Sequence, residues 1–315
     1  MDKWHQPDKT WGVFGIDTFE KYVDTFVIKG RFHKDVHEDV VNSFQTVEYL
    51  MAHAYYHYPM YDVAMNKLLQ LFEMAIKIRA KEYNIPEYYS NSKRKVSLND
   101  LINELTKEQA LKYLKDGLHQ ERRLRNIFAH PVRFGFGGGL FKQGIMPSIT
   151  TLNRLFLDQE TAIEAQNIHH QVEKRFDIFQ EGLFVLENKL KYLVTGIYFI
   201  EAFKYKNDWV YVSVVNPVTE NTFDDYSAHK FSSPFILLLK NPQTKNSSFE
   251  ATNIENNKPI TISPTKNPIN LSRLEIFIND INRLSKSNLE KYHRNHQYEQ
   301  AKQVVQFYYE YAWVE

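Results

Sequence analysis

Residues 68–83 read LLQLFEMAIKIRAKEY, and their apolar side chains recur close to every 3.6 residues. The same spacing extends back to residue 40 and is interrupted at Pro59. A period of 3.6 places such side chains on one face of an α-helix. The stretch therefore predicts two long helices that meet near Pro59 and form the core of an all-helical region.

Further helices are predicted downstream of this stretch. Residues 97–100 begin with serine and end with aspartate, the Ser-x-x-Asp pattern that starts a helix. Another helix is expected over residues 109–129, where Pro131 would stop it because proline disfavours the α conformation at the residue before it. Residues 33–188 therefore predict a helical domain, over which residues 1–32 lie as an aromatic arm.

The pattern changes beyond residue 188. Apolar and β-branched residues form three runs that are typical of strands, namely 193–203, 209–215 and 235–239. The polar residues 241–268 predict short edge strands and loops, and two helices are expected after them. The predicted fold class is thus α+β, with an all-helical N-terminal bundle followed by a smaller, strand-containing domain at residues 189–315.

Composition excludes several classes of protein. The chain has 315 residues, and 39 Lys and Arg against 38 Asp and Glu leave a net charge of only +1, so an RNA contact requires a local basic patch. The absence of cysteine excludes disulfides, thiolate metal sites and a cysteine nucleophile. No apolar leader opens the sequence and no apolar run is long enough to cross a bilayer. A cytoplasmic protein with no membrane contact is expected.

The most concentrated positive charge lies in residues 118–134, LHQERRLRNIFAHPVRF. One acid, Glu121, stands there against four arginines: Arg122, Arg123, Arg125 and Arg133. Such a cluster can hold a phosphate group. We therefore expect Arg122, Arg123 and Arg133 to contact RNA.

The same segment contains the groups needed to cleave RNA without a metal. His130 can take or give a proton near neutral pH, and the planar guanidinium of Arg125 can pair with two phosphoryl oxygens. Asn126 precedes His130 by four residues, so both lie on one helical face. Arg125 lies about 140° round an ideal helix from His130, so the helix must end or unwind near Ala129 for the two to converge.

The string RNIFAH at residues 125–130 resembles the catalytic signature of the HEPN superfamily, in which four to six residues separate an arginine from a histidine and a polar residue directly follows the arginine. It is most similar to abortive-infection members of that family. A string with this spacing that also has Asn directly after the arginine and Ala directly before the histidine is expected by chance about 0.002 times in a chain of this composition. Residues 68–83 look like the earlier core helix of the family, in which Glu73 could support Arg125 or His130.

The resemblance implies a metal-independent endoribonuclease that uses no cofactor and cleaves single-stranded RNA through a 2′,3′-cyclic phosphate. Arg125, Asn126 and His130 would form the catalytic set. In the family two protomers pair so that both motifs face one cleft, which implies a homodimer with a composite active site. A role in antiphage defence or as a toxin module follows, and the domain at 189–315 could sense a trigger or a regulatory partner.

Other interpretations of these residues remain open. The same cations could bind RNA or a nucleotide without cutting it, as in a regulatory protein. A histidine at a helix C-terminus can simply cap it, and an arginine-rich helix can be a solvated face. His53 with His57, and His33 with His37, have the i, i+4 spacing of a metal-binding face but lack a recognisable third ligand.

Overall fold

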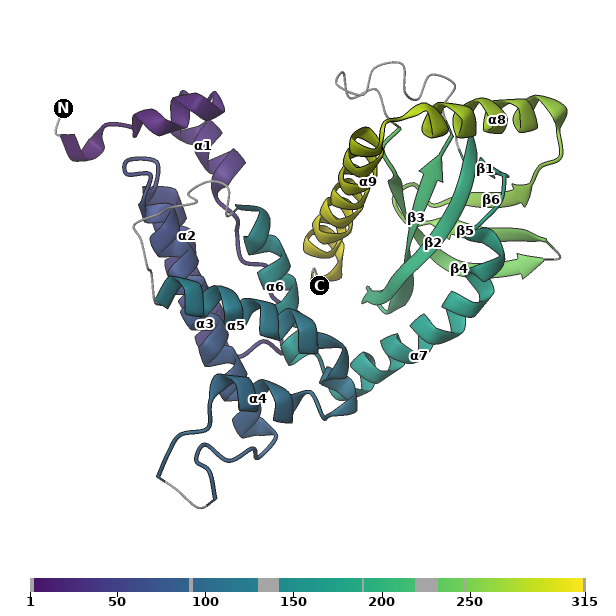
Figure 1. The fold of residues 1–315 in the computed structure, drawn as a ribbon. Coiled ribbons are helices and arrows are strands. Elements are labelled where there is room, and N and C mark those ends of the chain that lie inside the picture. Colours follow the sequence, from purple (N-terminus) through teal and green to yellow (C-terminus); the bar gives the residue numbers. More distant parts are fainter. Residues whose placement is uncertain are drawn as a thin grey trace. The chain divides into compact units, whose positions relative to one another are not determined.

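The computed structural model describes residues 3–90, 93–129, 142–188, 190–218, 232–245 and 247–313. The chain forms two compact units that divide between Ile163 and Glu164. The division falls inside a helix, whereas the change in sequence pattern lies near residue 188. The first unit is helical and the second is built on β-strands (Figure 1).

The helical unit contains α- and 3-10 helices with short connections. Its α-helices are α1 (Phe19–Phe26), α2 (Glu38–His53), α3 (Met60–Glu82), α4 (Leu98–Leu105), α5 (Lys115–Ala129), α6 (Lys142–Phe156) and the start of α7 (Gln159–Phe176). Its 3-10 helices are η1 (Lys3–His5), η2 (Lys9–Phe14) and η3 (Gln109–Leu114). The predicted helix over 109–129 is therefore one 3-10 helix followed by α5.

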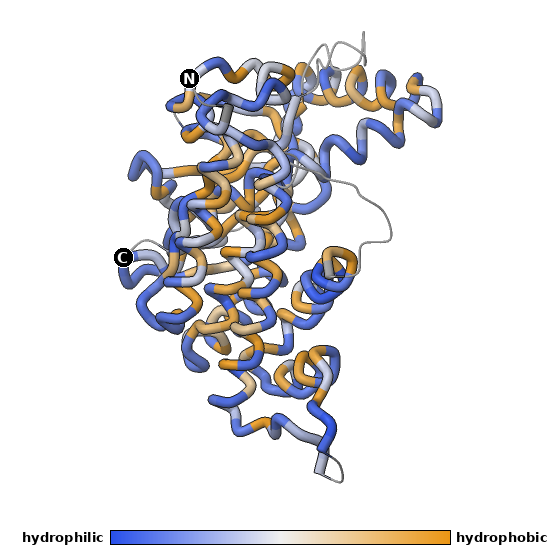
Figure 2. The backbone as a smooth tube through the Cα atoms, turned by 90° about the vertical axis from the view of Figure 1, so that its left-hand side faces the viewer, coloured by the Kyte–Doolittle hydropathy of each residue, from blue (hydrophilic) through white to orange (hydrophobic). Residues whose placement is uncertain are grey.

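Helix α3 is the centre of the helical unit. It packs against α2, α4, α5 and α6, and its buried side chains, among them Leu68, Leu69, Leu71 and Phe72, surround most of its circumference. A helix that is apolar on several faces is stable only when other helices cover them. Hydrophobic and hydrophilic residues alternate in short stretches along the coils of the backbone (Figure 2). The helix predicted from residues 68–83 is confirmed.

Two of the predicted helix starts are also confirmed. Pro59 is the residue before α3, and its ring suits the start of a helix because it has no N–H to leave unpaired. Ser97 caps α4, where its hydroxyl accepts a hydrogen bond from the backbone N–H of Asp100. In both places residues next to the helix start were sufficient to predict where the helix begins.

The N-terminal segment belongs to the core of the helical unit. Trp11 is buried, and its indole N–H donates to the carbonyl of Ala54 at 2.8 Å. The ring of Tyr22 packs edge-on against Trp11 at 4.6 Å between centroids, and its hydroxyl donates to the carbonyl of Met51. These aromatic residues bury their apolar area while their polar atoms find backbone acceptors.

The second unit is a closed antiparallel barrel in which each strand pairs with its neighbours in sequence. The strands are β1 (Phe184–Glu187), β2 (Lys191–Tyr205), β3 (Asp208–Pro217), β4 (Phe235–Lys245), β5 (Ser248–Asn253) and β6 (Lys258–Pro264). Pairing of β1 with β6, for example Leu186 opposite Ile262, closes the barrel. Closure removes the free edges of the sheet along the paired parts of β1 and β6.

Helices cover the barrel on both sides of its strands. Phe176 of α7 and Phe179 of the 3-10 helix η5 (Asp177–Phe179) pack with the inward side chains of the strands. On the outer face of β2 to β4, Tyr308 and Trp313 from the C-terminal end of the chain cover a second cluster. That end comprises α8 (Pro268–Arg283), α9 (Lys286–Phe307) and the π-helical turn η7 (Tyr308–Ala312).

The fold class predicted from the sequence is wrong. The chain is α+β overall, but its C-terminal half is a closed six-stranded antiparallel barrel, which is not a helical HEPN-like domain. Residues 241–268, expected to form edge strands and loops, supply most of β4 to β6. Their polar side chains alternate with buried ones such as Phe249 and Ala251, so this stretch forms the polar outer face of a barrel wall.

In the described part of the chain, no helix combines the length and the apolar character needed to cross a membrane.

Candidate functional site

Helix α5 carries the described part of the arginine cluster. It packs against α3, α4 and α6, and Arg122, Arg123, Arg125 and Asn126 all lie within it. His130 and Arg133, together with the glycine-rich run at 135–139, lie outside the described residues. The expected unwinding after Ala129 lies outside them too.

Glu73 of α3 holds the side chain of Arg125. Its Oε2 accepts from Nε of Arg125 at 2.9 Å and lies 2.7 Å from Nη2. Its Oε1 accepts from Nζ of Lys77, one turn further along α3, at 2.6 Å. One carboxylate therefore bridges two cations from two helices.

Glu73 stays ionised at neutral pH. Partial burial by itself would raise its pKa, but the hydrogen bond and charge of Lys77, followed by those of Arg125, hold that pKa below its usual value. Two cations share one negative charge, so the cluster keeps a net positive charge. An anion can therefore still be attracted to Arg125.

The guanidinium of Arg125 keeps donors for a ligand. A guanidinium has five N–H groups, and within the described residues Arg125 uses one on each of three contacts: two to Glu73 and one from Nη1 to Oδ1 of Asn126, at 3.3 Å. Two N–H groups of Arg125 are therefore not used in these contacts. The side chain is 34% exposed, so these donors are accessible.

Arg122 and Arg123 occupy different sides of α5. Nε of Arg122 is buried and has no hydrogen-bond partner in the described chain, whereas Arg123 is exposed, as is Asn126. From 100° per residue, Arg123 lies about 160° from Arg125 round the helix. The arginines therefore do not form one continuous patch.

Glu121, one turn before Arg125, is a buried carboxyl between α5 and α6. It is 8% exposed, and burial raises its pKa to about 7, although the hydrogen bond with Ser148 opposes the shift. Its Oε2 is buried with no partner among the described residues. A carboxylate in this position would be poorly compensated, so the neutral acid is favoured near pH 7.

The direction of the hydrogen bond between Ser148 and Glu121 depends on where the hydroxyl hydrogen of Ser148 goes. Oγ of Ser148 lies 2.8 Å from Oε1 of Glu121 and 2.9 Å from the carbonyl oxygen of Gly144. A hydroxyl has one hydrogen. If that hydrogen is donated to the carbonyl of Gly144, which can only accept, the carboxyl of Glu121 must be protonated to donate to Ser148.

His119 is a second titratable group on α5 that the sequence analysis did not select. Its Nε2 lies 3.3 Å from Oδ1 of Asn103, which can only accept, so Nε2 carries the proton. Burial and then the charges of Arg122, Lys115 and Arg123 lower the pKa of His119. It stands seven residues before Asn126, on nearly the same side of the helix. The sequence shows that His119 lies in the basic segment. It does not show that the side chain is partly buried.

Metal ligands do not gather in the described chain. No group of three or more His, Asp or Glu side chains lies within reach of one ion in this part of the protein. His33 binds protein atoms instead, since its Nε2 donates to the carbonyl oxygen of Asn153 at 2.8 Å. Neither histidine pair considered above therefore forms a metal site among the described residues.

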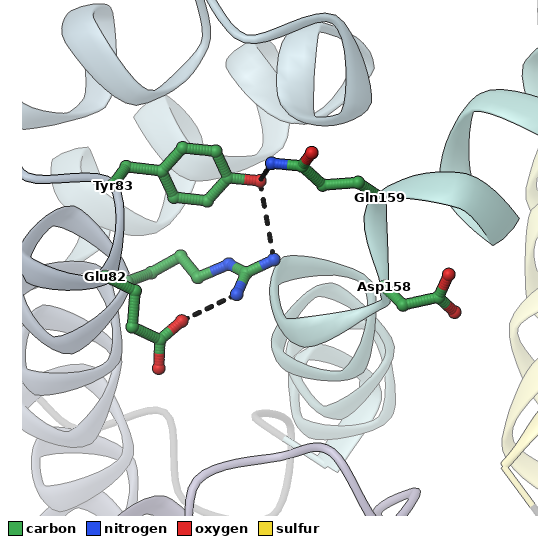
Figure 3. A pocket seen from close by; sticks show the side chains of 5 residues that line it. Glu82, Tyr83, Asp158 and Gln159 are labelled. Carbon is green, nitrogen blue, oxygen red and sulfur yellow. Dashed lines mark hydrogen bonds and ion pairs between the residues drawn. The ribbon is translucent and has the colours of Figure 1, made fainter.

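A pocket of about 250 Å³ lies between the end of α3 and the start of α7, away from these residues (Figure 3). Arg79 donates to Glu82 at 2.6 Å, and the hydroxyl of Tyr83 accepts from Nε2 of Gln159 at 2.9 Å. The carboxylate of Asp158 points away from the other side chains in Figure 3, and it caps α7 by accepting from the N–H of Thr161. Most polar groups of this pocket thus bind one another and link α3 to α7, although Nε of Arg79 is buried with no hydrogen-bond partner among the described residues.

The structure therefore brings together Glu73, Arg125 and Asn126, and it adds His119 and Glu121 on the same helix. The likeness of residues 125–130 to the HEPN signature stays a prediction. Comparison with known proteins gives no family: no protein-family model, no curated protein and no solved structure matches this chain.

Proposed function

We propose that this protein is a metal-independent endoribonuclease that cleaves single-stranded RNA, with its active site at the C-terminal part of α5. One observation carries the proposal. Glu73 holds Arg125 in a half-exposed position beside Asn126, and His130 follows five residues later in the sequence. RNA cleavage by its own 2′-hydroxyl requires proton transfer and a cation on the phosphoryl oxygens, which an imidazole and a fixed guanidinium can supply, and the amide can orient either group.

The reaction needs two proton transfers and stabilisation of one developing charge. The proton leaves the 2′-hydroxyl, the 2′ oxygen bonds to phosphorus, and the bond from phosphorus to the 5′ oxygen breaks as that oxygen gains a proton. The products are a 2′,3′-cyclic phosphate and a 5′-hydroxyl. Arg125 would neutralise the phosphoryl oxygens, His130 would move the protons, and Asn126 would orient either group.

The ion pair of Arg125 with Glu73 is consistent with this role. A long side chain that is already held loses less conformational entropy when substrate binds. Arg122, about 60° from Arg125 round the helix, and Arg133 beyond the described residues would contact neighbouring RNA phosphates. Arg123, on the other side of α5, would contact a more distant part of the RNA. Glu73 would then be a positioning residue that acts through Arg125.

A homodimer would complete the site. One chain supplies one such histidine, whereas acid–base cleavage is best served by two proton-transfer groups and two sets of cations. We propose a two-fold pair in which both motifs face one cleft. Cleavage of cellular RNA harms the producing cell, so we also propose a cytoplasmic defence or toxin role in which the barrel unit receives a trigger or a regulatory partner.

The wild-type protein with end-labelled RNA in excess EDTA tests the reaction. We expect cleavage that needs no metal and leaves 2′,3′-cyclic phosphate ends. RNA binding without any product would favour the alternative, a regulatory protein that holds RNA or a nucleotide on the same cations. Cleavage that stops in EDTA would contradict the metal-independent mechanism.

Subunit mixing tests the dimer. Wild-type protein is mixed with an equal amount of His130→Ala protein, and the activity is measured after exchange. If one cleft needs both histidines, about a quarter of the dimers stay active, whereas simple dilution leaves about half of the activity. Full activity of a monomer at high dilution would contradict the composite site.

A further inference from the structure

A second pocket, of about 380 Å³, lies in the barrel unit between α9 and the segment that leads into β4. Its volume is within the range of small-molecule sites. Nε2 of Gln303 donates to the carbonyl oxygen of Pro234 at 2.7 Å and so ties the two walls together. Tyr292, His296, Tyr298 and Glu299 of α9 (Lys286–Phe307) line one wall of this pocket.

His296 is held in one orientation in this pocket. Its Nε2 lies 3.1 Å from Oδ1 of Asn216, and the same oxygen accepts from Nε2 of Gln300 at 3.3 Å. An amide oxygen can only accept, so Nε2 of His296 carries the proton and Nδ1 is a hydrogen-bond acceptor. Burial and the charge of His293 lower the pKa of His296, which keeps the ring neutral.

Aromatic rings and a carboxylate form the rest of the wall. Tyr292 packs edge-on against His296 with ring centroids 5.2 Å apart, and burial raises its pKa to about 12, so the phenol stays protonated. Tyr298 is 45% exposed and offers a free ring face. Glu299 is 35% exposed and adds a carboxylate. The wall therefore suits a flat ring that carries N–H donors.

Basic side chains run along α9 next to the pocket. Lys291, Arg294 and Lys302 are exposed and, with Tyr298, fall within an arc of about 80° when 100° is allowed per residue. From Lys291 to Lys302 the helix rises about 16 Å. Lys302 is 3.7 Å from Glu299, a weak surface ion pair. This row is longer than a single phosphate needs and fits the backbone of a nucleic-acid strand.

We propose that this pocket binds an unpaired base of single-stranded RNA and that guanine fits it best. The ring stacks on Tyr298, as bases stack on exposed aromatic side chains in RNA-binding proteins. The adjacent N1–H and N2–H groups of guanine donate to the carboxylate of Glu299, and uracil lacks such a pair of donors. Lys291 and Arg294 pair with the flanking phosphates. The barrel unit thereby selects RNA whether or not the chain cleaves it.

Binding is measured with full-length His130→Ala protein, so that cleavage cannot remove the probe. The probes are fluorescent 12-nucleotide oligouridines with one central guanosine, with inosine in its place, or with no substitution. We expect the guanosine probe to bind about tenfold more tightly than the unsubstituted oligouridine, which offers no such pair of donors to Glu299. The inosine probe keeps N1–H but lacks the N2 amino group, so its affinity should lie between the two. Free guanosine monophosphate should bind at least tenfold more weakly than the guanosine probe because it lacks the contacts to Lys291 and Arg294.

Three variants test the residues. Glu299→Gln should remove the preference for guanosine, and Tyr298→Ala should weaken all three probes by about tenfold through lost stacking. Glu290→Gln, an exposed acid on the same helix outside the pocket, is the matched control and should bind as the parent does.

Two results would overturn the inference: equal binding of the guanosine and uridine probes, or an unchanged preference in Glu299→Gln. Equal affinity for free guanosine monophosphate and the guanosine probe would overturn RNA as the ligand. The proposed cleavage stands apart from this test. A wild-type protein that cuts no RNA but shows the guanosine preference refutes the nuclease alone, and cleavage without that preference refutes the pocket alone.

Discussion

Arg125→Ala is expected to lower the rate of RNA cleavage by about 10²- to 10³-fold, the usual cost of removing one group that stabilises the transition-state charge. Folding should change little. Glu73 keeps its contact with Lys77 at 2.6 Å, and a half-exposed ion pair contributes about 1 kcal/mol or less. Cleavage assays and thermal unfolding of the same preparations measure both effects.

Companion variants separate charge from geometry at Arg125. Arg125→Lys keeps the charge but cannot contact two oxygens in one plane, so it should recover only part of the activity. Arg123→Ala removes an exposed arginine from the same helix and should weaken RNA binding slightly without a large loss of turnover. His130→Ala should lower turnover by about 10²- to 10⁴-fold while RNA still binds. Full activity of Arg125→Ala would refute the proposed site.

Glu73→Gln tests whether Glu73 positions the guanidinium of Arg125 for cleavage. It keeps the shape of the side chain but removes the charge that holds Arg125. We expect weaker substrate binding and partial loss of turnover, because a mobile guanidinium must be ordered in each cycle. The single variant Lys77→Ala should lower turnover less than Glu73→Gln does. Among the described residues, Lys77 binds Glu73 and makes no recorded contact with Arg125.

Glu121→Gln is expected to make the protein more stable than the wild type at pH 8.5, by up to about 3 kcal/mol. Burial raises the pKa of Glu121 from 4.5 to about 7, and each unit corresponds to about 1.4 kcal/mol. The folded state binds this proton more tightly than the unfolded state does. The free energy of unfolding therefore falls as the pH rises from about 4.5 to 7 and is lowest above it.

Urea unfolding at pH 5.5 and 8.5, followed by circular dichroism, measures this effect. Other groups also titrate in this interval: the lowered pKa values of His119 and His296 make the protein more stable as pH rises through their range. The difference between wild type and Glu121→Gln cancels their contribution. Glu20→Gln, at an exposed acid, is the control and should follow the wild type. A parallel pH dependence of Glu121→Gln and wild type would show that Glu121 is ionised in the folded protein.

The helical part of the chain was largely predictable because its signals are local. The apolar spacing of residues 68–83 and the cap at Ser97 involve residues within one or two turns of each other. Arg125 and Asn126 could likewise be selected, since they lie in one short stretch. The support of Arg125 by Glu73 joins residues 52 apart in sequence, and no spacing rule reports such a contact.

The burial of Glu121 and the partial burial of His119 could not be read from the sequence. Both stand in a segment rich in charge, where exposure is the usual state. Their environment depends on how closely α4 and α6 approach α5, and on partners such as Asn103 and Ser148. The shifted pKa values follow from that approach.

The sequence by itself determined most of the helices, the stretch that concentrates positive charge, and the side chains that could handle a phosphodiester. Only the tertiary structure decided that the strands close into a barrel, through the pairing of β1 with β6, and that Glu73 reaches Arg125. The physical reason is the distance along the sequence over which each kind of interaction acts. Propensity, capping and periodicity act between near neighbours, whereas closure, burial and pKa depend on which distant segments pack together.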